Sequence, residues 1–365
     1  MSRFARNRRV FFFEEPLFED GRPHLRAFVC PKTGVHVNTP IMPSGLPPER
    51  LLELQKELLD SMVVDHDIES CITWYYTPMA RRFASGLRSR VTVYDCMDEL
   101  SAFAGAPAAM KENEKALFGE ADLVFTGGAS LYASKRKQHS SVHLFPSSVD
   151  VTHFARALSS ETEPVDQLLL PRPRLGYAGV IDERMDLQLI EQVAAQRPHW
   201  QFIFLGPVVK IDPASLPQRA NIHYLGIKPY ADLPEYLSGW DLGILPFALN
   251  ESTRYISPTK TPEYLAAGLR VVSTPIRDVI SPYGDLGLVS IANGPSEFIS
   301  AAESLLESPS SSDFQASVQA FLSKSSWDKT WSEMNALIEE KIILKHLSVG
   351  QSVPAKASGE GASHV

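Results

Sequence analysis

Residues 257–268, Ser-Pro-Thr-Lys-Thr-Pro-Glu-Tyr-Leu-Ala-Ala-Gly, combine prolines, a lysine, a glutamate and a closing glycine at the spacing of a short helix. The N-cap could be Ser257 or Thr261, because each precedes a proline, which is favoured at the first helical position. In either case free backbone N–H groups and the Lys260 ammonium would meet at one spot, which suits a phosphate. Glu263, about a turn later, has two carboxylate oxygens that could accept hydrogen bonds from a ribose. A surface ion pair between Lys260 and Glu263 is the simpler alternative.

A second segment of this kind, Gly-Tyr-Ala-Gly-Val-Ile-Asp-Glu-Arg, ends at Arg184 and is predicted as strand, glycine turn and helix start. Glycine lets a backbone approach a ligand closely, so Gly179 is a candidate contact. We expect a helix with Asp182 as its N-cap and Arg184 in its first turn. A cation there opposes the helix dipole, whereas a guanidinium fork suits a diphosphate. The alternative is a solvated Arg184 that pairs with Glu183 or Asp186.

Alternating strands and helices must position these residues. In each half of the chain, short apolar runs alternate with amphipathic stretches, which is the pattern of a parallel α/β sheet. The predicted fold is two Rossmann-like domains facing a cleft, with ligands beyond the carboxyl ends of the strands. The predicted parts are an N-terminal Rossmann-like domain (1–156), a linker (157–173), a C-terminal Rossmann-like domain (174–323), a helix (324–348) and a disordered tail (349–365).

Composition narrows the possible partners. The chain has 365 residues, a formal net charge of −8 and three cysteines with no C-x-x-C pair. Nucleic acid is bound mainly through clustered positive charge, so this balance argues against a nucleic-acid partner. Isolated cysteines favour reduced thiols in the cytoplasm. No apolar run approaches the ~18 residues of a membrane span, while the basic N-terminus leaves peripheral contact with the inner face of a membrane as an option.

Taken together, these motifs resemble the GT-B type glycosyltransferases (family 1/4-like). The resemblance is to bacterial cell-envelope and exopolysaccharide transferases that carry a Ser-Pro-x-Lys-x-x-Glu-Tyr-Leu-Ala-Ala-Gly stretch. The second half is similar over residues 174–306, and the first half shares residues 74–78 and 94–99. The resemblance implies a transferase that passes a sugar from a nucleotide diphosphate donor to a saccharide or lipid-linked acceptor in envelope or exopolysaccharide synthesis. It also implies that residues 1–156 form the acceptor-side domain and residues 174–323 the nucleotide-sugar-binding domain.

The resemblance also implies roles for individual residues. In the family, the helix-start lysine and the earlier arginine hold the donor diphosphate, which corresponds to Lys260 and Arg184 here. The family glutamate that holds the ribose corresponds to Glu263. Tyr230 lies in the segment where the family contacts the donor base. The predicted donor-binding residues are Arg184, Lys260, Glu263, Thr259, Gly179 and Tyr230.

Other features concern catalysis. Many relatives have a glutamate eight residues before the ribose glutamate, but this chain has Tyr255, so a retaining mechanism does not carry over. Asp98, at the carboxyl end of a first-half strand, is the predicted base that takes the acceptor hydroxyl proton. Its alternative role is the N-cap of a helix that begins near Leu100. Residues 65–67 resemble a D-x-D metal motif of a different glycosyltransferase fold, and we expect neither a metal nor a cofactor.

The start of the sequence departs from the usual order of such domains. Residues 2–9 are predicted as the end of a helix and residues 10–13 as a second strand, so we expect the first domain to lack its first strand. Two other functions stay open. One is a nucleotide-sugar epimerase on the same fold. The other is a non-catalytic nucleotide-sugar-binding protein, which this departure and Tyr255 favour.

Overall fold

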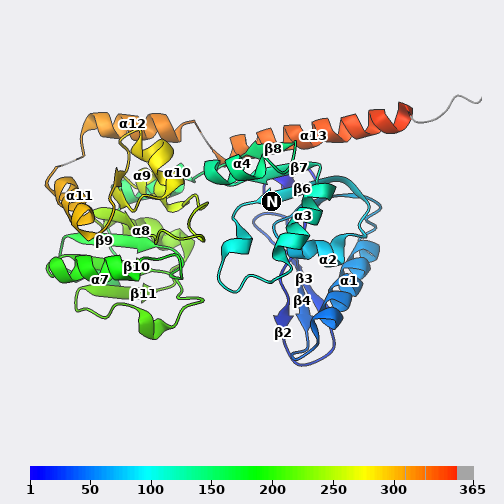
Figure 1. The fold of residues 1–365 in the computed structure, drawn as a ribbon, viewed down its shortest axis with the longest axis horizontal. Coiled ribbons are helices and arrows are strands. Elements are labelled where there is room, and N and C mark those ends of the chain that lie inside the picture. Colours follow the sequence, from blue (N-terminus) through cyan, green and yellow to red (C-terminus); the bar gives the residue numbers. More distant parts are fainter. Residues whose placement is uncertain (309, 325, 352–365) are drawn as a thin grey trace, which may run out of the picture. The chain divides into compact units, whose positions relative to one another are not determined.

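The computed structural model of the protein describes residues 1–308, 310–324 and 326–351, and its strands pair mainly in parallel (Figure 1). The chain divides into two compact units. One holds Met1–Tyr94, Gly119–Leu123 and the chain from Trp331 onward, and the other holds Asp95–Phe118 and Val124–Thr330. The predicted boundaries between acceptor-side domain, linker and nucleotide domain stay a prediction.

The first unit opens with a small sheet. The central strand β4 pairs in parallel with β1 and β2 and antiparallel with β3. The sequence predicted the strand at β1 but not the antiparallel β3. The elements of this part are η1 (Phe4–Arg6), β1 (Phe11–Phe13), β2 (Leu17–Phe18), β3 (His24–Val29), β4 (His36–Met42), α1 (Pro48–Asp65), η2 (Pro78–Ala80) and α2 (Arg81–Ala84).

The long helix α13 (Trp327–Gln351) enters this unit and packs on its N-terminal turn. The buried Phe4 ring lies edge-on to Trp331, with 6.2 Å between the ring centroids, and edge-on to Trp74 at 5.4 Å. Arg8 Nη2 donates to Glu339 Oε1 at 2.5 Å. The N-terminal turn therefore ties the start of the chain to α13.

A second sheet has the order β5-β6-β7-β8, and the boundary between the two units passes through β6. The strands are β5 (Cys71–Tyr75), β6 (Ser89–Cys96), β7 (Leu123–Thr126) and β8 (Val142–Leu144). Beside them in sequence are η3 (Leu100–Ala102), α3 (Met110–Glu120), α4 (Ala129–Lys135), α5 (Val151–Phe154), η4 (Ala155–Ser159) and α6 (Val165–Leu168). The Asp98 loop leaves this sheet directly after β6.

A six-stranded parallel sheet forms the core of the second unit, in the order β11-β10-β9-β12-β13-β14. Its strands are β9 (Arg174–Ala178), β10 (Gln201–Leu205), β11 (Ile222–Gly226), β12 (Leu242–Leu245), β13 (Arg270–Ser273) and β14 (Ser290–Ile291). Every residue of β9, β10 and β12 is buried, as expected for strands covered on both faces. Figure 1 shows β9, β10 and β11 side by side.

The helices and short turns between these strands are η5 (Pro213–Ser215), η6 (Tyr230–Asp232), η7 (Ile280–Gly284), α7 (Leu187–Gln196), α8 (Leu233–Ser238), α9 (Lys260–Ala266), α10 (Arg277–Val279), α11 (Pro295–Glu307) and α12 (Ser312–Leu322). The chain proceeds from β9 outward to β11, then crosses to β12 on the other side of β9. The strand order therefore reverses between β9 and β12, which is where ligands bind in open α/β sheets. Gly179 follows β9 at this point.

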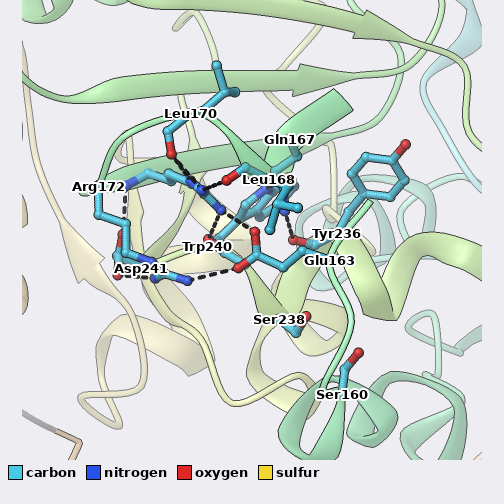
Figure 2. Close-up of polar contacts among 12 residues, drawn as sticks. Ser160, Glu163, Gln167, Leu168, Leu170, Arg172, Tyr236, Ser238, Trp240 and Asp241 are labelled. Atoms are coloured by element: carbon cyan, nitrogen blue, oxygen red, sulfur yellow. Dashed lines mark hydrogen bonds and ion pairs between the residues drawn. The ribbon is translucent and has the colours of Figure 1, made fainter. Parts of the chain in front are cut away.

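The predicted linker segment is anchored to the second unit by polar contacts (Figure 2). The buried Arg174 guanidinium donates to the Leu168 and Leu170 carbonyl oxygens and, through Nη1, to Glu163 Oε2 at 2.6 Å. The exposed Arg172 pairs with Glu163 and Asp241 (Figure 2). These contacts fix the chain just before β9.

Among the described residues, none of the helices combines the length and the apolar character that crossing a membrane requires. None of the three cysteines, all of them described, forms a disulfide. The predicted tail overlaps the end of α13 at residues 349–351, and the rest of it lies outside the described residues.

Candidate functional site

Two glycines at the ends of adjacent strands shape the floor of the candidate site. Gly179 follows β9 and its N–H donates to the Leu205 carbonyl at 2.8 Å. Gly206 follows β10 with a φ of +137°, and a Cβ added there would lie 1.9 Å from the Gly179 carbonyl oxygen. A Cβ added at Gly179 would lie 3.2 Å from Lys260 Cε. The glycines thus bring backbone against backbone and leave room for the lysine stem.

Lys260 and Glu263 lie together at the start of α9. Lys260 Nζ is 3.2 Å from Glu263 Oε2 and 3.3 Å from Thr259 Oγ1. The N-cap residue is Thr259, without a side-chain cap hydrogen bond, so the prediction of Ser257 or Thr261 as N-cap is wrong. Neither Pro258 nor Pro262 is the first residue of α9, because the helix begins at Lys260. The glycine that closes the motif has a φ of +82°, as predicted for a residue just past a helix end.

The Glu263 carboxylate is largely buried. Burial raises its pKa, while the Lys260 ammonium and then the more distant His153 act in the opposite direction. Its side chain is 16% exposed, against 25% for Lys260. A buried carboxylate with one cationic partner has capacity left to accept further hydrogen bonds.

Tyr230 stands next to this pair. Burial, and then the negative charges of Glu263 and Asp150, raise the pKa of its hydroxyl to about 12. The His153 ring stacks on the Tyr230 ring at 4.3 Å, and His153 Nε2 donates to the Tyr230 carbonyl at 2.9 Å. Tyr230 is nevertheless 53% exposed. No signal in the sequence points to His153 as a partner of Tyr230, because α5 lies far from α9 in the chain.

Arg184 lies in a turn before α7 and not in the first turn of a helix, so that prediction is wrong. The N-cap of α7 is Asp186, whose side chain accepts from the Leu189 N–H. Asp182, which is 4% exposed, instead binds the guanidinium: Nη2 donates to its Oδ2 at 2.7 Å and Nε to its Oδ1 at 3.0 Å. The ring of Phe103 faces the guanidinium at 5.4 Å. The buried Asp182 carboxylate therefore orients Arg184, and the prediction of Asp182 as a helix N-cap is wrong.

The Asp98 carboxylate interacts electrostatically with the Arg184 guanidinium. Burial raises the pKa of its carboxyl group; Arg184 lowers that pKa and Asp182 raises it. The alternative role of Asp98 as a helix N-cap is wrong, since Glu99 occupies that position before η3 and makes no side-chain cap hydrogen bond. Asp98 thus has a solvent-restricted carboxyl group beside a cation.

The predicted residues therefore form two groups. Lys260, Glu263, Thr259, Gly179 and Tyr230 make up the first group, and Arg184 and Asp98 make up the second. The buried Tyr177 connects them, because its ring lies against Gly179 and its hydroxyl interacts electrostatically with Arg184. Within the described residues no hydrogen bond joins Arg184 to Lys260.

Comparisons with known proteins match the part of the chain that carries these residues. Residues 172–308, which include β9 and α9, match the family described as Glycosyl transferases group 1. A relative from Bacillus subtilis (strain 168), named for teichuronic acid biosynthesis as the glycosyltransferase TuaH, is 26% identical over 261 residues. The match covers 65% of this chain and 64% of that relative, which is less than two thirds of the relative's length.

Solved structures match over nearly the whole chain. A sucrose-phosphate synthase from Thermosynechococcus elongatus has a TM-score of 0.67 at 15% identity, covering 93% of this chain and 90% of that one. An α,α-trehalose 6-phosphate synthase from Burkholderia multivorans has a TM-score of 0.65 at 13% identity, with coverages of 95% and 92%. HepE from Anabaena, solved with UDP, has a TM-score of 0.61 at 14% identity, with coverages of 85% and 87%.

At these identities, the likeness to solved structures establishes the fold, and the family match concerns the segment that carries the first group of site residues. Both agree with the resemblance found in the sequence. The chain therefore has the GT-B fold, and its residues 172–308 resemble the group 1 glycosyl transferases.

Proposed function

We propose that this protein transfers a sugar from a nucleotide diphosphate sugar to a saccharide or lipid-linked acceptor during the synthesis of an envelope or extracellular polysaccharide. The observation that carries the proposal is the grouping of Lys260, Glu263, Gly179 and Tyr230 at the strand-order reversal, inside the segment that matches the transferase family. The relative named for teichuronic acid biosynthesis supports an envelope polysaccharide as the product.

The donor roles follow from the chemistry of each side chain. The Lys260 ammonium would bind the diphosphate, and Gly179 would let the phosphates approach the backbone. The carboxylate oxygens of Glu263 would accept hydrogen bonds from the ribose hydroxyls. Tyr230, which is exposed on one face and stacked on His153 on the other, would contact the base.

Transfer then requires charge stabilisation and proton removal. Positive groups near the diphosphate, Lys260 and Arg184, would stabilise the negative charge that develops on the leaving group. Asp98 would take the proton of the acceptor hydroxyl. Its raised pKa makes it a stronger base than an exposed aspartate, which suits that role.

We also propose a cytoplasmic reaction with peripheral contact at the inner membrane face. The reduced cysteines support the compartment, and the arginines near the N-terminus support the membrane contact. Two of these arginines already have partners: Arg8 pairs with Glu339 and Arg9 donates to the His66 carbonyl. Flotation with vesicles that contain anionic lipid tests the contact, and loss of flotation at high salt would identify it as electrostatic.

A thermal-shift panel of UDP-, GDP- and dTDP-sugars tests the donor assignment, because a ligand that binds the folded state raises Tm. The neighbour solved with UDP makes UDP-sugars the first choice. Product analysis with labelled donor then separates the alternatives. Sugar transferred to an acceptor supports the transferase, an isomerised donor without acceptor would indicate an epimerase, and binding without turnover would indicate a non-catalytic protein.

A further inference from the structure

A buried lysine lies beneath the loop that carries Asp98. Lys135, the last residue of α4, is 1% exposed. Its Nζ is 2.8 Å from Glu99 Oε2 and donates to both carboxylate oxygens of Glu114 on α3, each at 2.8 Å. Placing charges in the interior is costly, and such groups persist only where their partners are well arranged. Close packing of α3 and α4 would not by itself require a buried cation with two carboxylates.

The Glu99 carboxylate is held at both oxygens. Oε2 faces Lys135, and Oε1 accepts a hydrogen bond from Ser101 Oγ at 2.8 Å. Glu99 therefore anchors the loop after β6 to the end of α4. The same loop packs against the turn before α4, since a Cβ added at Gly127 would lie 2.9 Å from the Met97 carbonyl oxygen.

Asp98 is the neighbour of Glu99 in the chain. Within the described residues its carboxylate accepts no hydrogen bond, so the backbone on either side determines where it lies. On one side Cys96 Sγ donates weakly to the Asp98 carbonyl at 3.6 Å. On the other side is the Glu99 anchor, which makes shorter and charged contacts.

We propose that Glu99 is a positioning residue for Asp98, with Lys135 as its buried anchor. The inference rests on the proposed function, because it needs Asp98 to act on the acceptor. Without the anchor, the loop backbone has one restraint fewer on the α4 side, and the Asp98 carboxylate spreads over several positions relative to Arg184 and the acceptor. Displacement of a catalytic group by about 1 Å can cost up to about 100-fold in rate.

Glu114 supplies a matched control. It binds the same lysine at the same distance, but it lies on α3, outside the Asp98 loop. Cys96 Sγ lies 3.9 Å from Glu114 Oε1. If the triad only stabilises the fold, Glu99→Gln and Glu114→Gln should lower Tm and kcat alike. If Glu99 positions Asp98, Glu99→Gln should affect kcat selectively.

The experiment is a double-mutant cycle on the full chain. Glu99→Gln, Glu114→Gln, Asp98→Asn and the pair Glu99→Gln with Asp98→Asn are compared by kcat, donor KM and Tm. We expect Glu99→Gln to lower kcat about 10-fold or more with donor KM unchanged, and Glu114→Gln to leave kcat within about twofold. In the Asp98→Asn background, Glu99→Gln should lower kcat no further, because the group it positions is already absent.

Equal kcat losses for the two glutamine variants, or full additivity of Glu99→Gln with Asp98→Asn, would overturn the inference. If Glu99→Gln does not fold, Ser101→Ala removes only the hydroxyl donor to Glu99, and its smaller kcat loss must also vanish in the Asp98→Asn background. An unchanged kcat in Asp98→Asn alone would overturn the role of Asp98 and this inference with it. The donor panel tests the proposed function separately.

Discussion

Lys260 and Glu263 form an ion pair one turn apart on α9, with 3.2 Å between Nζ and Oε2. In the sequence this pair was the alternative to a ligand site, yet the structure makes the two compatible. Glu263 is too buried to serve as a surface partner only, and Lys260 lies against Gly179 at a strand end. On the proposed function, donor binding adds a phosphate partner to a lysine that already has a carboxylate.

Replacement of that lysine should therefore affect phosphate recognition selectively. We expect Lys260→Ala to weaken the affinity for a nucleoside diphosphate about 10- to 100-fold, since a hydrogen bond to a charged group contributes about 1.5–3 kcal/mol. The affinity for the nucleoside without phosphates should change little. Isothermal calorimetry with both ligands measures this. Arg254→Ala, an exposed cation six residues earlier that pairs with Glu251, is the control and should bind like the parent; equal losses for the two ligands would contradict the assignment.

The ionisation of Glu263 should make the stability of the folded protein depend on pH. Because burial raises its pKa in the folded protein, its contribution to stability is fully present below the unfolded-state pKa and is lost as pH rises through the folded-state pKa. Glu263→Gln should therefore be more stable than the parent at neutral pH, and the difference should shrink as pH falls towards about 4. Tm without nucleotide, from about pH 4 to 8, checks this. Glu303→Gln changes a glutamate whose side chain is 43% exposed and pairs with Arg197, so it should show no such trend.

Tyr230 should contribute through its ring. Its ring is stacked on His153 and is still 53% exposed, so one face is available to a base. We expect Tyr230→Ala to weaken nucleoside affinity about 10-fold, within the range for stacking of a base on an aromatic side chain, and Tyr230→Phe to retain it. Titration of nucleoside by intrinsic fluorescence or calorimetry distinguishes them. A large loss in Tyr230→Phe would show that the hydroxyl, and not the ring, matters.

Metal removal should leave the transfer reaction intact. On the proposed function, Lys260 and Arg184 would supply the positive charge that stabilises the diphosphate leaving group, without a metal ion. We expect the same kcat in buffer with excess EDTA as in buffer with Mg²⁺. Loss of turnover in EDTA that Mg²⁺ restores would refute the metal-independent reaction.

Loss of a residue from the polar cluster before β9 should lower the stability of the protein and leave ligand binding unchanged. Arg174→Met removes a buried guanidinium and leaves Glu163 and the carbonyl oxygens of Leu168, Leu170 and Gly239 with fewer donors, which should cost ~3–5 kcal/mol. Arg172→Met removes an exposed arginine that pairs with the same Glu163 and should cost ~1 kcal/mol or less. Urea unfolding at one temperature compares them. Similar losses for the two variants would mean that burial does not set the contribution of this cluster.

The parallel sheet of the second unit could be predicted from the sequence, because strands buried on both faces leave continuous apolar runs. The helix of the Lys260 motif and its closing glycine were also confirmed, because a glycine just past a helix end is a local sequence signal. N-caps were less predictable: Asp182 and Asp186 both precede α7, and only the structure shows that Arg184 occupies Asp182. The sequence offered no signal for partners distant in the chain, such as His153 against Tyr230.

The first half was harder to predict. The antiparallel β3 lies where six residues are mostly exposed, so hydrophobic alternation is weak there. The missing first strand, the domain boundaries and the roles assigned to site residues stay predictions. The fold and the likeness to the group 1 transferases could be predicted from the motifs, because backbone geometry and charge at a strand end constrain several neighbouring residue types at once.

The contact between Gly206 and the Gly179 carbonyl limits what evolution or an engineer can change. A side chain at residue 206 would push the strand-end turn that borders Lys260, and its left-handed φ adds strain for any other residue type. A saturation library at residue 206 selected for turnover should thus return glycine alone, whereas the neighbouring Pro207 should tolerate replacement. Redesign of donor preference has to begin at side chains such as Tyr230 and keep the backbone contact between Gly206 and Gly179 unchanged.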